Sequence, residues 1–320
     1  MTPLYFAPME GLTDVNYRQA HYACFLGVSK YFMPFVSPSA SLSYTVRERM
    51  DISPLQNAGM PVVPQILCKV PEYFNAMSQA FRDAGYGEVN LNLGCPVGTV
   101  TGKGKGSAML RDLNALRRFL DDIFAAPPLP VSIKTRIGFD DYAHWRELTL
   151  LFNDYPLTEL IVHPRTRAEA YRGAPHQELL PEMLSLTRHR LVYNGDLFSV
   201  AEGRAFLSQH PGVSALMLGR GLAANPALAQ ELSGGAHVTL DALRAFHDRL
   251  YTSYLRSRSE AAVVGRMHLC MHYLSFCFET PDRVRRAIRR ATSVSEYNGA
   301  VASIFAGCRL SDAPVFHAPD

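Results

Sequence analysis

The chain has 320 residues, 48% of them hydrophobic and 19% charged, and a formal net charge of +3 at pH 7. This composition is typical of a soluble globular protein, and no apolar run reaches the roughly 18 residues that a membrane span needs. The first residues, MTPLYFAPMEG, lack the basic region of a signal peptide, and the six scattered cysteines form no C-x-x-C pair. We therefore expect a cytoplasmic protein with no metal site and no membrane association.

Eight short apolar runs alternate with helical or loop stretches in the first two thirds of the chain. Alternating strand and helix patterns predict parallel pairing, and eight such units predict an α/β fold of the (β/α)8 TIM barrel type. A doubly wound open sheet is the alternative, but no G-x-G-x-x-G motif follows the first run. The predicted strands are residues 4–9, 31–36, 62–67, 88–93, 131–135, 159–162, 191–193 and 215–218. The predicted helices between them include 71–84, 113–124, 142–152 and 200–209.

Polar residues stand at the ends of seven of these runs. In a barrel the carboxyl ends of the strands meet at one mouth, where active sites lie, so we expect these residues to gather there. Pro8, Met9 and Glu10 turn the chain out of the first run. The third run ends near Gln65, whose amide can both donate and accept hydrogen bonds. Taken singly, each could be only a tight turn or a buried amide bonded to backbone.

The fourth run leads into LNLGCPVGTVTGKGKGSAML, residues 91–110, in which Asn92 precedes Cys95. A glycine and a proline flank Cys95 and restrict the backbone around the thiol, as the mounting of a reactive group requires. The glycine-rich stretch that follows carries Lys103 and Lys105 and could approach a polyanion or fold over a pocket. A lone cysteine is more often a small buried hydrophobe, and the spacing does not fit a nucleotide-binding P-loop.

The fifth and sixth runs add basic residues to the predicted mouth. Lys134 and Arg136 are two residues apart and project to one face of their strand, where two cations in an interior pocket would need an anionic guest. The sixth run ends at His163, and Arg165 and Thr166 begin a basic loop suited to RNA. The alternatives are a solvated strand end for the first pair and a structural histidine with exposed arginines for the second.

The seventh and eighth runs end in the turn motifs Asn194-Gly195-Asp196 and Gly219-Arg220. The loops after the last two strands of a barrel often bind phosphate through backbone N–H groups. An arginine there would supply the countercharge. These two motifs, weak by themselves, jointly predict a phosphate site.

From about residue 236 the pattern is only helical, so we predict a barrel domain over 1–235 and a helical domain over 236–320. The predicted helices are 241–256, 261–278, 281–292 and 295–305, the second apolar almost all round and therefore the buried one. The helical part holds 11 of the 32 basic residues, all arginine, and 8 of the 29 acidic ones, which leaves 21 of each in residues 1–235. Its DRVRRAIRR segment is either a solvated face or a contact for RNA phosphates.

LNLGCP followed by V-x-G-x-G-x-G and a helix, together with the His-x-Arg-Thr segment, resembles the active-site segments of the tRNA-dihydrouridine synthases. These are flavin enzymes that reduce uridine in tRNA. The resemblance extends from about residue 4 to 226. APMEG is similar to the C-type bacterial members and GLTD to the B-type, so the position of the modified uridine is left open. Arg266-Met267-His268 stands where relatives often have Arg-x-Lys.

The resemblance implies an FMN enzyme, monomeric and active in tRNA processing, that uses NADPH to reduce a specific tRNA uridine to 5,6-dihydrouridine. It also implies that hydride passes from flavin N5 to uracil C6, while Cys95 protonates C5. The residues implied for the cofactor are Pro8, Met9, Glu10, Gln65, Lys134, His163, Asn194, Gly195, Asp196, Gly219 and Arg220. Those implied for the uridine or the rest of the tRNA are Asn92, Arg136, Arg165, Thr166, Lys103, Lys105 and Arg266.

Two other functions stay open at this point. An FMN barrel oxidoreductase acting on a free pyrimidine, of the dihydroorotate dehydrogenase type, would share the cofactor site but would have no use for an arginine-bearing helical domain. A barrel that binds RNA without catalysis would hold no flavin.

Overall fold

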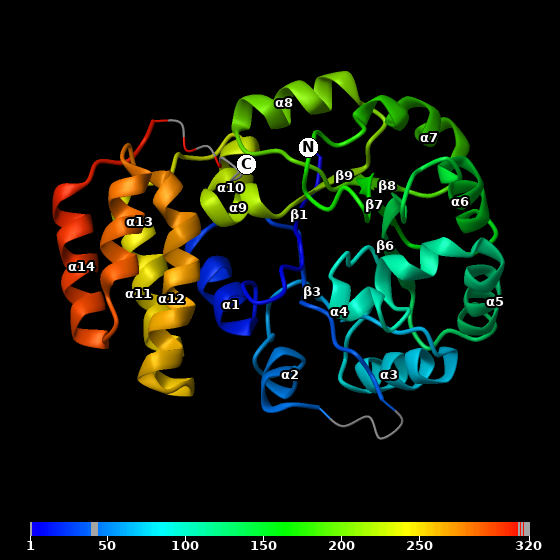
Figure 1. Ribbon diagram of the computed structural model, residues 1–320, viewed down its shortest axis with the longest axis horizontal. Coiled ribbons are helices and arrows are strands. Elements are labelled where there is room, and N and C mark those ends of the chain that lie inside the picture. The colour runs from blue at the N-terminus through cyan, green and yellow to red at the C-terminus, as the bar shows by residue number, and fades with distance from the viewer. Residues whose placement is uncertain (1, 40–43, 313, 315, 317–320) are drawn as a thin grey trace.

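The computed structural model describes residues 2–39, 44–312, 314 and 316, and its largest feature is a parallel barrel (Figure 1). Nine strands form one sheet in the order β3-β2-β1-β9-β8-β7-β6-β5-β4. They are β1 Leu4–Phe6, β2 Lys30–Phe32, β3 Val62–Val63, β4 Gln65–Ile66, β5 Val89–Leu93, β6 Val131–Gly138, β7 Leu160–Thr166, β8 Leu191–Tyr193 and β9 Ala215–Leu218. Only Pro64, which has no N–H to donate, separates β3 from β4, so the two are halves of one strand and close the barrel. The predicted TIM barrel is confirmed.

Helices surround the barrel, and the longer ones cover the outer face of the sheet. They are α1 Val15–Cys24, α2 Val46–Asp51, α3 Pro71–Asp83, α4 Gly98–Thr101, α5 Leu113–Phe124, α6 Trp145–Phe152, α7 Leu180–Leu186, α8 Val200–Gln209, α9 Arg220–Ala224 and α10 Leu228–Leu232, with 3-10 helices η1 Gly106–Arg111 and η2 Gln177–Leu179. Helix α5 illustrates why they form, because it buries Leu116, Phe119, Leu120 and Ile123, the spacing of one helical face. The side chain of Asp112 caps its first turn.

The barrel interior is small and becomes polar toward the mouth. Its apolar part consists of Tyr5, Ala7, Phe32, Val63, Ile161, Val192, Ala215 and Met217. In the register of the sheet, Lys134 lies opposite Asn92 on β5 and opposite Ile161 on β7, and Ile161 belongs to this apolar interior. Arg136 lies opposite His163. Facing positions of paired strands share a side of the sheet, so these polar side chains project into the barrel.

The remaining helices pack beside the barrel as a bundle, on the left of Figure 1. They are α11 Leu240–Ser257, α12 Glu260–Leu274, η3 Ser275–Cys277, α13 Pro281–Arg290 and α14 Val294–Gly307. Helix α12 contacts α9, α11, α13 and α14, in agreement with its apolar pattern. The bundle meets the barrel through α1 against α11 and α9 against α12. A boundary at residue 235 remains a prediction, and the predicted domain's final residues lie outside the described part of the chain.

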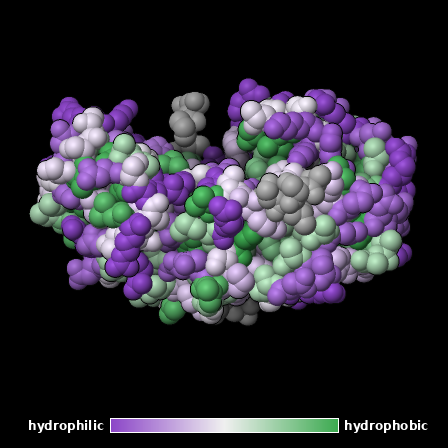
Figure 2. Space-filling view, turned by 90° about the horizontal axis from the view of Figure 1, so that it is seen from below, coloured by the Kyte–Doolittle hydropathy of each residue, from purple (hydrophilic) through white to green (hydrophobic). Residues whose placement is uncertain are grey.

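The surface between the two parts is hollowed, as Figure 2 shows in the upper outline of the molecule. Hydrophilic residues cover most of the face seen there, with hydrophobic ones scattered among them. Among the described residues, no helix has both the length and the apolar character needed to cross a bilayer.

Candidate active site

Cys95 lies in a turn whose backbone is held from two sides. The side chain of Asn92 accepts hydrogen bonds from the backbone N–H groups of Gly94 and Cys95, at 3.0 and 2.9 Å. The carbonyl of Cys95 accepts one from the hydroxyl of Ser107 at 2.8 Å. Gly106 has a φ of +60°, and a Cβ there would come within 3.1 Å of the Cys95 Cβ. The glycine-rich stretch thus packs against the cysteine, and it forms α4 and η1.

The thiol of Cys95 is partly buried, and this burial raises its pKa. The Val97 N–H and the cations Lys134 and Arg136 act in the opposite direction, because they stabilise the thiolate. The raised pKa keeps the thiol protonated at neutral pH. A protonated thiol beside groups that stabilise its anion is suited to donate a proton.

A chain of side-chain amides connects this turn to the barrel interior. Asn92 donates to Gln65 at 2.7 Å, Gln65 donates to Asn90 at 2.8 Å, and Asn90 donates to Ser132 at 2.9 Å. Gln65, Asn90 and Ser132 are fully buried. Asn90 and Ser132 were not singled out from the sequence, although their alternation with apolar residues on β5 and β6 was the available signal. The chain fixes the orientation of the Gln65 amide at the barrel mouth.

Lys134 is the unpaired cation of the site. No hydrogen bond or ion pair of its ammonium group occurs within the described residues. Burial, and to a smaller extent the neighbouring Arg136 guanidinium, lowers the pKa of Lys134 to about 7. Burying an uncompensated ammonium is costly, so this position favours an anionic guest.

Arg136 joins the cysteine turn to the loop after β7. Its Nε donates to the Gly94 carbonyl at 3.0 Å, and its Nη1 donates to the carbonyls of Thr166 and Ala170 at 2.7 and 2.8 Å. The guanidinium also lies 5.5 Å from the ring centroid of Tyr171, which is 54% exposed. Arg136 therefore positions the site, and its contact with a substrate remains a prediction.

His163 and Arg165 form a buried pair on β7. Arg165 Nη1 lies 3.0 Å from His163 Nε2. A guanidinium can only donate, so Nε2 accepts and the proton of the neutral ring sits on Nδ1. Burial, and then the neighbouring cations led by Arg136, hold the pKa of His163 well below its usual value. His163 is thus a neutral Nδ1–H donor.

Asp196, in the loop after β8, connects the end of β7 to the start of α9. Its carboxylate accepts from Arg165 on one oxygen and from Arg220 on the other, each at 2.5 Å. Three rings surround the Arg220 guanidinium, with centroids at 4.8 Å for Tyr171, 5.5 Å for Phe198 and 5.3 Å for Phe316. Arg220 is therefore held rigidly at the predicted phosphate position. The contact with Phe316, near the C-terminus, had no signal in the sequence.

The other predicted cofactor residues border the same mouth. Asn194 donates to the Met217 carbonyl at 2.7 Å, and a Cβ on Gly195 would overlap the Tyr193 hydroxyl. A Cβ on Gly219 would lie 3.8 Å from the sulfur of Met9, so the loop of Pro8, Met9 and Glu10 runs beside the start of α9. Glu10 is half exposed and pairs with Arg47.

The predicted tRNA residues divide into exposed and buried ones. Lys103 is exposed, and Lys105 donates to the Ser37 hydroxyl at 2.6 Å. Thr166 is buried and caps the turn to Glu169. Arg266 lies 3.4 Å from the carboxylate of Asp14, a residue of the barrel, so it joins the bundle to the barrel in this structure.

The described residues contain no group of three or more histidine, cysteine or acidic side chains arranged to hold a metal ion. The fold and the mouth residues define a (β/α)8-barrel enzyme whose reactive groups lie at the carboxyl ends of the strands. A family model described as "Dihydrouridine synthase (Dus)" matches residues 5–297. The chain belongs to the dihydrouridine synthase family, whose enzymes reduce uridine to dihydrouridine, and the predicted family is confirmed.

Curated relatives agree with this assignment. The chain is 34% identical over 230 residues to "Probable tRNA-dihydrouridine synthase 2" of Bacillus subtilis (strain 168), a match that covers 69% of each chain. It is 27% identical over 259 residues to "Probable tRNA-dihydrouridine synthase" of Rhodobacter capsulatus, covering 79% of this chain and 78% of the other.

Solved structures share the fold at low sequence identity. The old yellow enzyme homologue from Zymomonas mobilis has a TM-score of 0.55 at 12% identity, and the match covers 77% of this chain and 92% of that one. Morphinone reductase has a TM-score of 0.51 at 13% identity, with 77% and 88% covered. Both likenesses concern the barrel architecture.

Proposed function

We propose that this enzyme reduces a specific uridine of tRNA to 5,6-dihydrouridine, with FMN as its cofactor and NADPH as the reductant. The observation that carries the proposal is the thiol of Cys95, held by Asn92 and Ser107 beside the partly buried, unpaired side chain of Lys134. Both curated relatives cited above bear names that specify tRNA. We further propose that the protein acts in the cytoplasm as a monomer.

The residues at the mouth fit a flavin. A flavin has a ring edge that both donates and accepts hydrogen bonds, a phosphate, and a negative charge when reduced. Gln65 offers an oriented amide, Lys134 an unpaired cation, and His163 an Nδ1–H donor. The loops at Gly195 and Gly219 are the proposed phosphate contacts, with Arg220 as the countercharge. Bound FMN would supply the hydride for uracil C6.

Cys95 would complete the reduction from the opposite face of the uracil. Its Sγ–H bond breaks and the proton forms the new bond at C5, so hydride and proton together add one H2 across C5=C6. The thiolate left behind is stabilised by the Val97 N–H, Lys134 and Arg136, and it recovers a proton from solvent. Tyr171 offers an exposed ring at the mouth on which a base could stack.

The tRNA would lie across the barrel mouth and the helical bundle. Arginines of α13 and the lysines after α4 are the proposed phosphate contacts, with the residues beyond about 235 as the RNA-binding domain. Asn92, Arg136 and Arg165 would act mainly by holding the site in shape, given their internal hydrogen bonds.

An anaerobic experiment tests the proposal directly. The purified protein is reduced with NADPH, and the flavin absorbance is followed as unmodified tRNA or a free pyrimidine is added. We expect rapid reoxidation by tRNA alone. Reoxidation only by the free pyrimidine would show the dihydroorotate dehydrogenase-like activity instead, and a protein that never binds flavin would be the non-catalytic RNA-binding barrel.

A further inference from the structure

A groove of about 360 Å3 lies on the rim of the barrel, outside the residues assigned above. One wall is the end of η1 and the start of α5, with Leu110, Arg111 and Leu113. The other wall is the turn between β6 and α6, residues 137–144. This turn is tight, since a Cβ on Gly138 would overlap the Asp141 carbonyl. Two helix-flanking segments of the barrel thus form a fixed depression.

The guanidinium of Arg111 lines this groove, and that of Arg167 lies near the groove residue Phe139; within the described residues neither has an anionic partner. Arg111 lies 3.8 Å from the ring centroid of Phe139, and Arg167 lies 5.1 Å from the same ring. Within the described residues neither side chain forms a hydrogen bond or an ion pair, and the Nε of Arg167 is buried without a partner. Stacking on a ring orients a guanidinium while leaving its N–H groups available for a phosphate.

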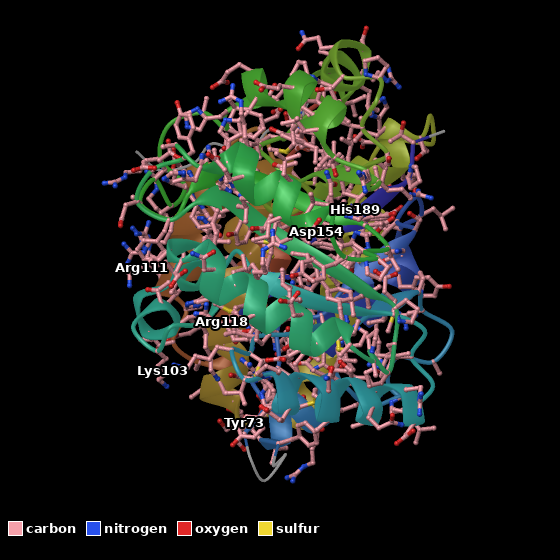
Figure 3. The ribbon with its side chains drawn as sticks, turned by 90° about the vertical axis from the view of Figure 1, so that its right-hand side faces the viewer. Tyr73, Lys103, Arg111, Arg118, Asp154 and His189 are labelled. Atoms are coloured by element: carbon pink, nitrogen blue, oxygen red, sulfur yellow. The ribbon has the colours of Figure 1, made fainter. Side chains whose placement is uncertain are left out.

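The groove lies within reach of an RNA strand whose target base is in the active site. Helix η1 begins at Gly106, in contact with Cys95, and ends at Arg111. Five steps of a 3-10 helix span roughly 10 Å, a length that a few nucleotides of RNA cover. In Figure 3 Lys103 and Arg111 project along the same edge of the barrel. Their row suits a polyanion better than a single small anion.

Acidic residues in the groove narrow the choice of ligand. Asp140 and Asp141 line it together with His144. Two carboxylates disfavour a free inorganic anion, but they can accept hydrogen bonds from the amino or imino groups of a base. A guanidinium that can bind a phosphate, next to carboxylates that can bind the donors of a base, therefore matches the two parts of a nucleotide.

We propose that this rim groove binds a nucleotide of the tRNA strand flanking the target uridine, with its phosphate on Arg111 and the neighbouring phosphate on Arg167. The assignment rests on the proposed function, because it takes tRNA to be the substrate. It extends the RNA contact from the lysines after α4 to the turn between β6 and α6.

The test is the affinity of the flavin-loaded protein for an unmodified tRNA transcript, measured over a range of salt concentrations. Arg111→Ala should weaken binding about three- to tenfold and lower the slope of log K against log salt by about 0.7 to 0.9, the value for one lost phosphate contact. Arg118→Ala is the matched control, since it removes an exposed arginine of α5 that does not line the groove. Arg111→Lys should keep the salt slope, because the charge is retained, and flavin absorbance confirms that each variant is folded.

Equal weakening by Arg111→Ala and Arg118→Ala would overturn the groove assignment, because charge alone would then explain the effect. A higher KM for NADPH with unchanged tRNA affinity would overturn it too, since the groove would be holding the dinucleotide. Failure of the unaltered protein to bind tRNA at all would refute the proposed function and the groove assignment together. That result is distinct from a selective loss in Arg111→Ala.

Discussion

The amide of Asn92 holds Cys95 in place, with its Oδ1 2.9 Å from the Cys95 backbone nitrogen. We expect Asn92→Ala to lower the rate of tRNA reduction at least tenfold, because the thiol loses its fixed direction. Reduction of the flavin by NADPH should change much less, because Gln65 loses the hydrogen bond from Asn92 but keeps its own to Asn90. Asn92→Ser should give an intermediate rate, because serine is a weaker acceptor in such turns. Stopped-flow measurement of both half-reactions tests these expectations. A slower flavin reduction with a normal tRNA step would contradict this role.

Asp14 is the barrel's anchor for the helical bundle. Its carboxylate accepts from the Tyr254 hydroxyl at 3.0 Å and lies 3.2 and 3.4 Å from the guanidinium groups of Arg258 and Arg266. Removing one partner of a buried ion pair leaves the others uncompensated, so Asp14→Ala should lower the free energy of unfolding by about 3 kcal/mol. Chemical denaturation measures this.

A double-mutant cycle then separates a role in docking from a role in binding tRNA. Asp14→Ala and Arg266→Ala should show a coupling of about 1 kcal/mol or more in the free energy of unfolding. Strictly additive effects on stability, with a loss of tRNA affinity in Arg266→Ala, would instead favour Arg266 as a direct RNA contact.

Ala170 is in a left-handed conformation, with φ of +54°, in the loop that carries Tyr171. A side chain in this conformation costs roughly 1–2 kcal/mol, which a glycine would avoid. Part of that gain is lost because the more flexible glycine raises the entropy of the unfolded chain. Ala170→Gly should therefore raise the free energy of unfolding by about 0.5–1 kcal/mol. Ala168→Gly, two residues earlier and without a positive φ, should not stabilise the protein. Thermal melting of both variants provides the comparison.

Lys134 should make stability depend on pH. Its pKa is about 7 in the folded protein and 10.5 ordinarily, so between these values the unfolded chain binds more protons and stability rises with pH. The penalty of the buried charge is complete below pH 7. Lys134→Met should therefore stabilise the ligand-free protein more at pH 6 than at pH 9, as measured by urea denaturation. An equal effect at both pH values would show that the ammonium is not titrating in this range.

The barrel was predictable because the apolar pattern of each strand and helix lies within its own short stretch of sequence. Helices α5 and α8 begin and end at the predicted residues, since Asp112 and Ser199 cap them and one face of each is apolar. The gathering of His163, Asp196 and Arg220 at one mouth also followed from the strand order. What could not be predicted were contacts between distant segments. The pairing of Arg165 with Asp196, the approach of Phe316 to Arg220 and the docking of Arg266 on Asp14 depend on packing that no local pattern records.

The most direct test of the account is a single-turnover comparison of the unaltered enzyme with Cys95→Ala. Both proteins should bind flavin and accept hydride from NADPH at similar rates, because the thiol is not part of that half-reaction. With reduced flavin in place, unmodified tRNA should reoxidise the unaltered enzyme quickly and the variant at least a hundredfold more slowly, since no group then protonates C5. Reoxidation of Cys95→Ala at the normal rate, with dihydrouridine formed, would show that Cys95 is not the proton donor.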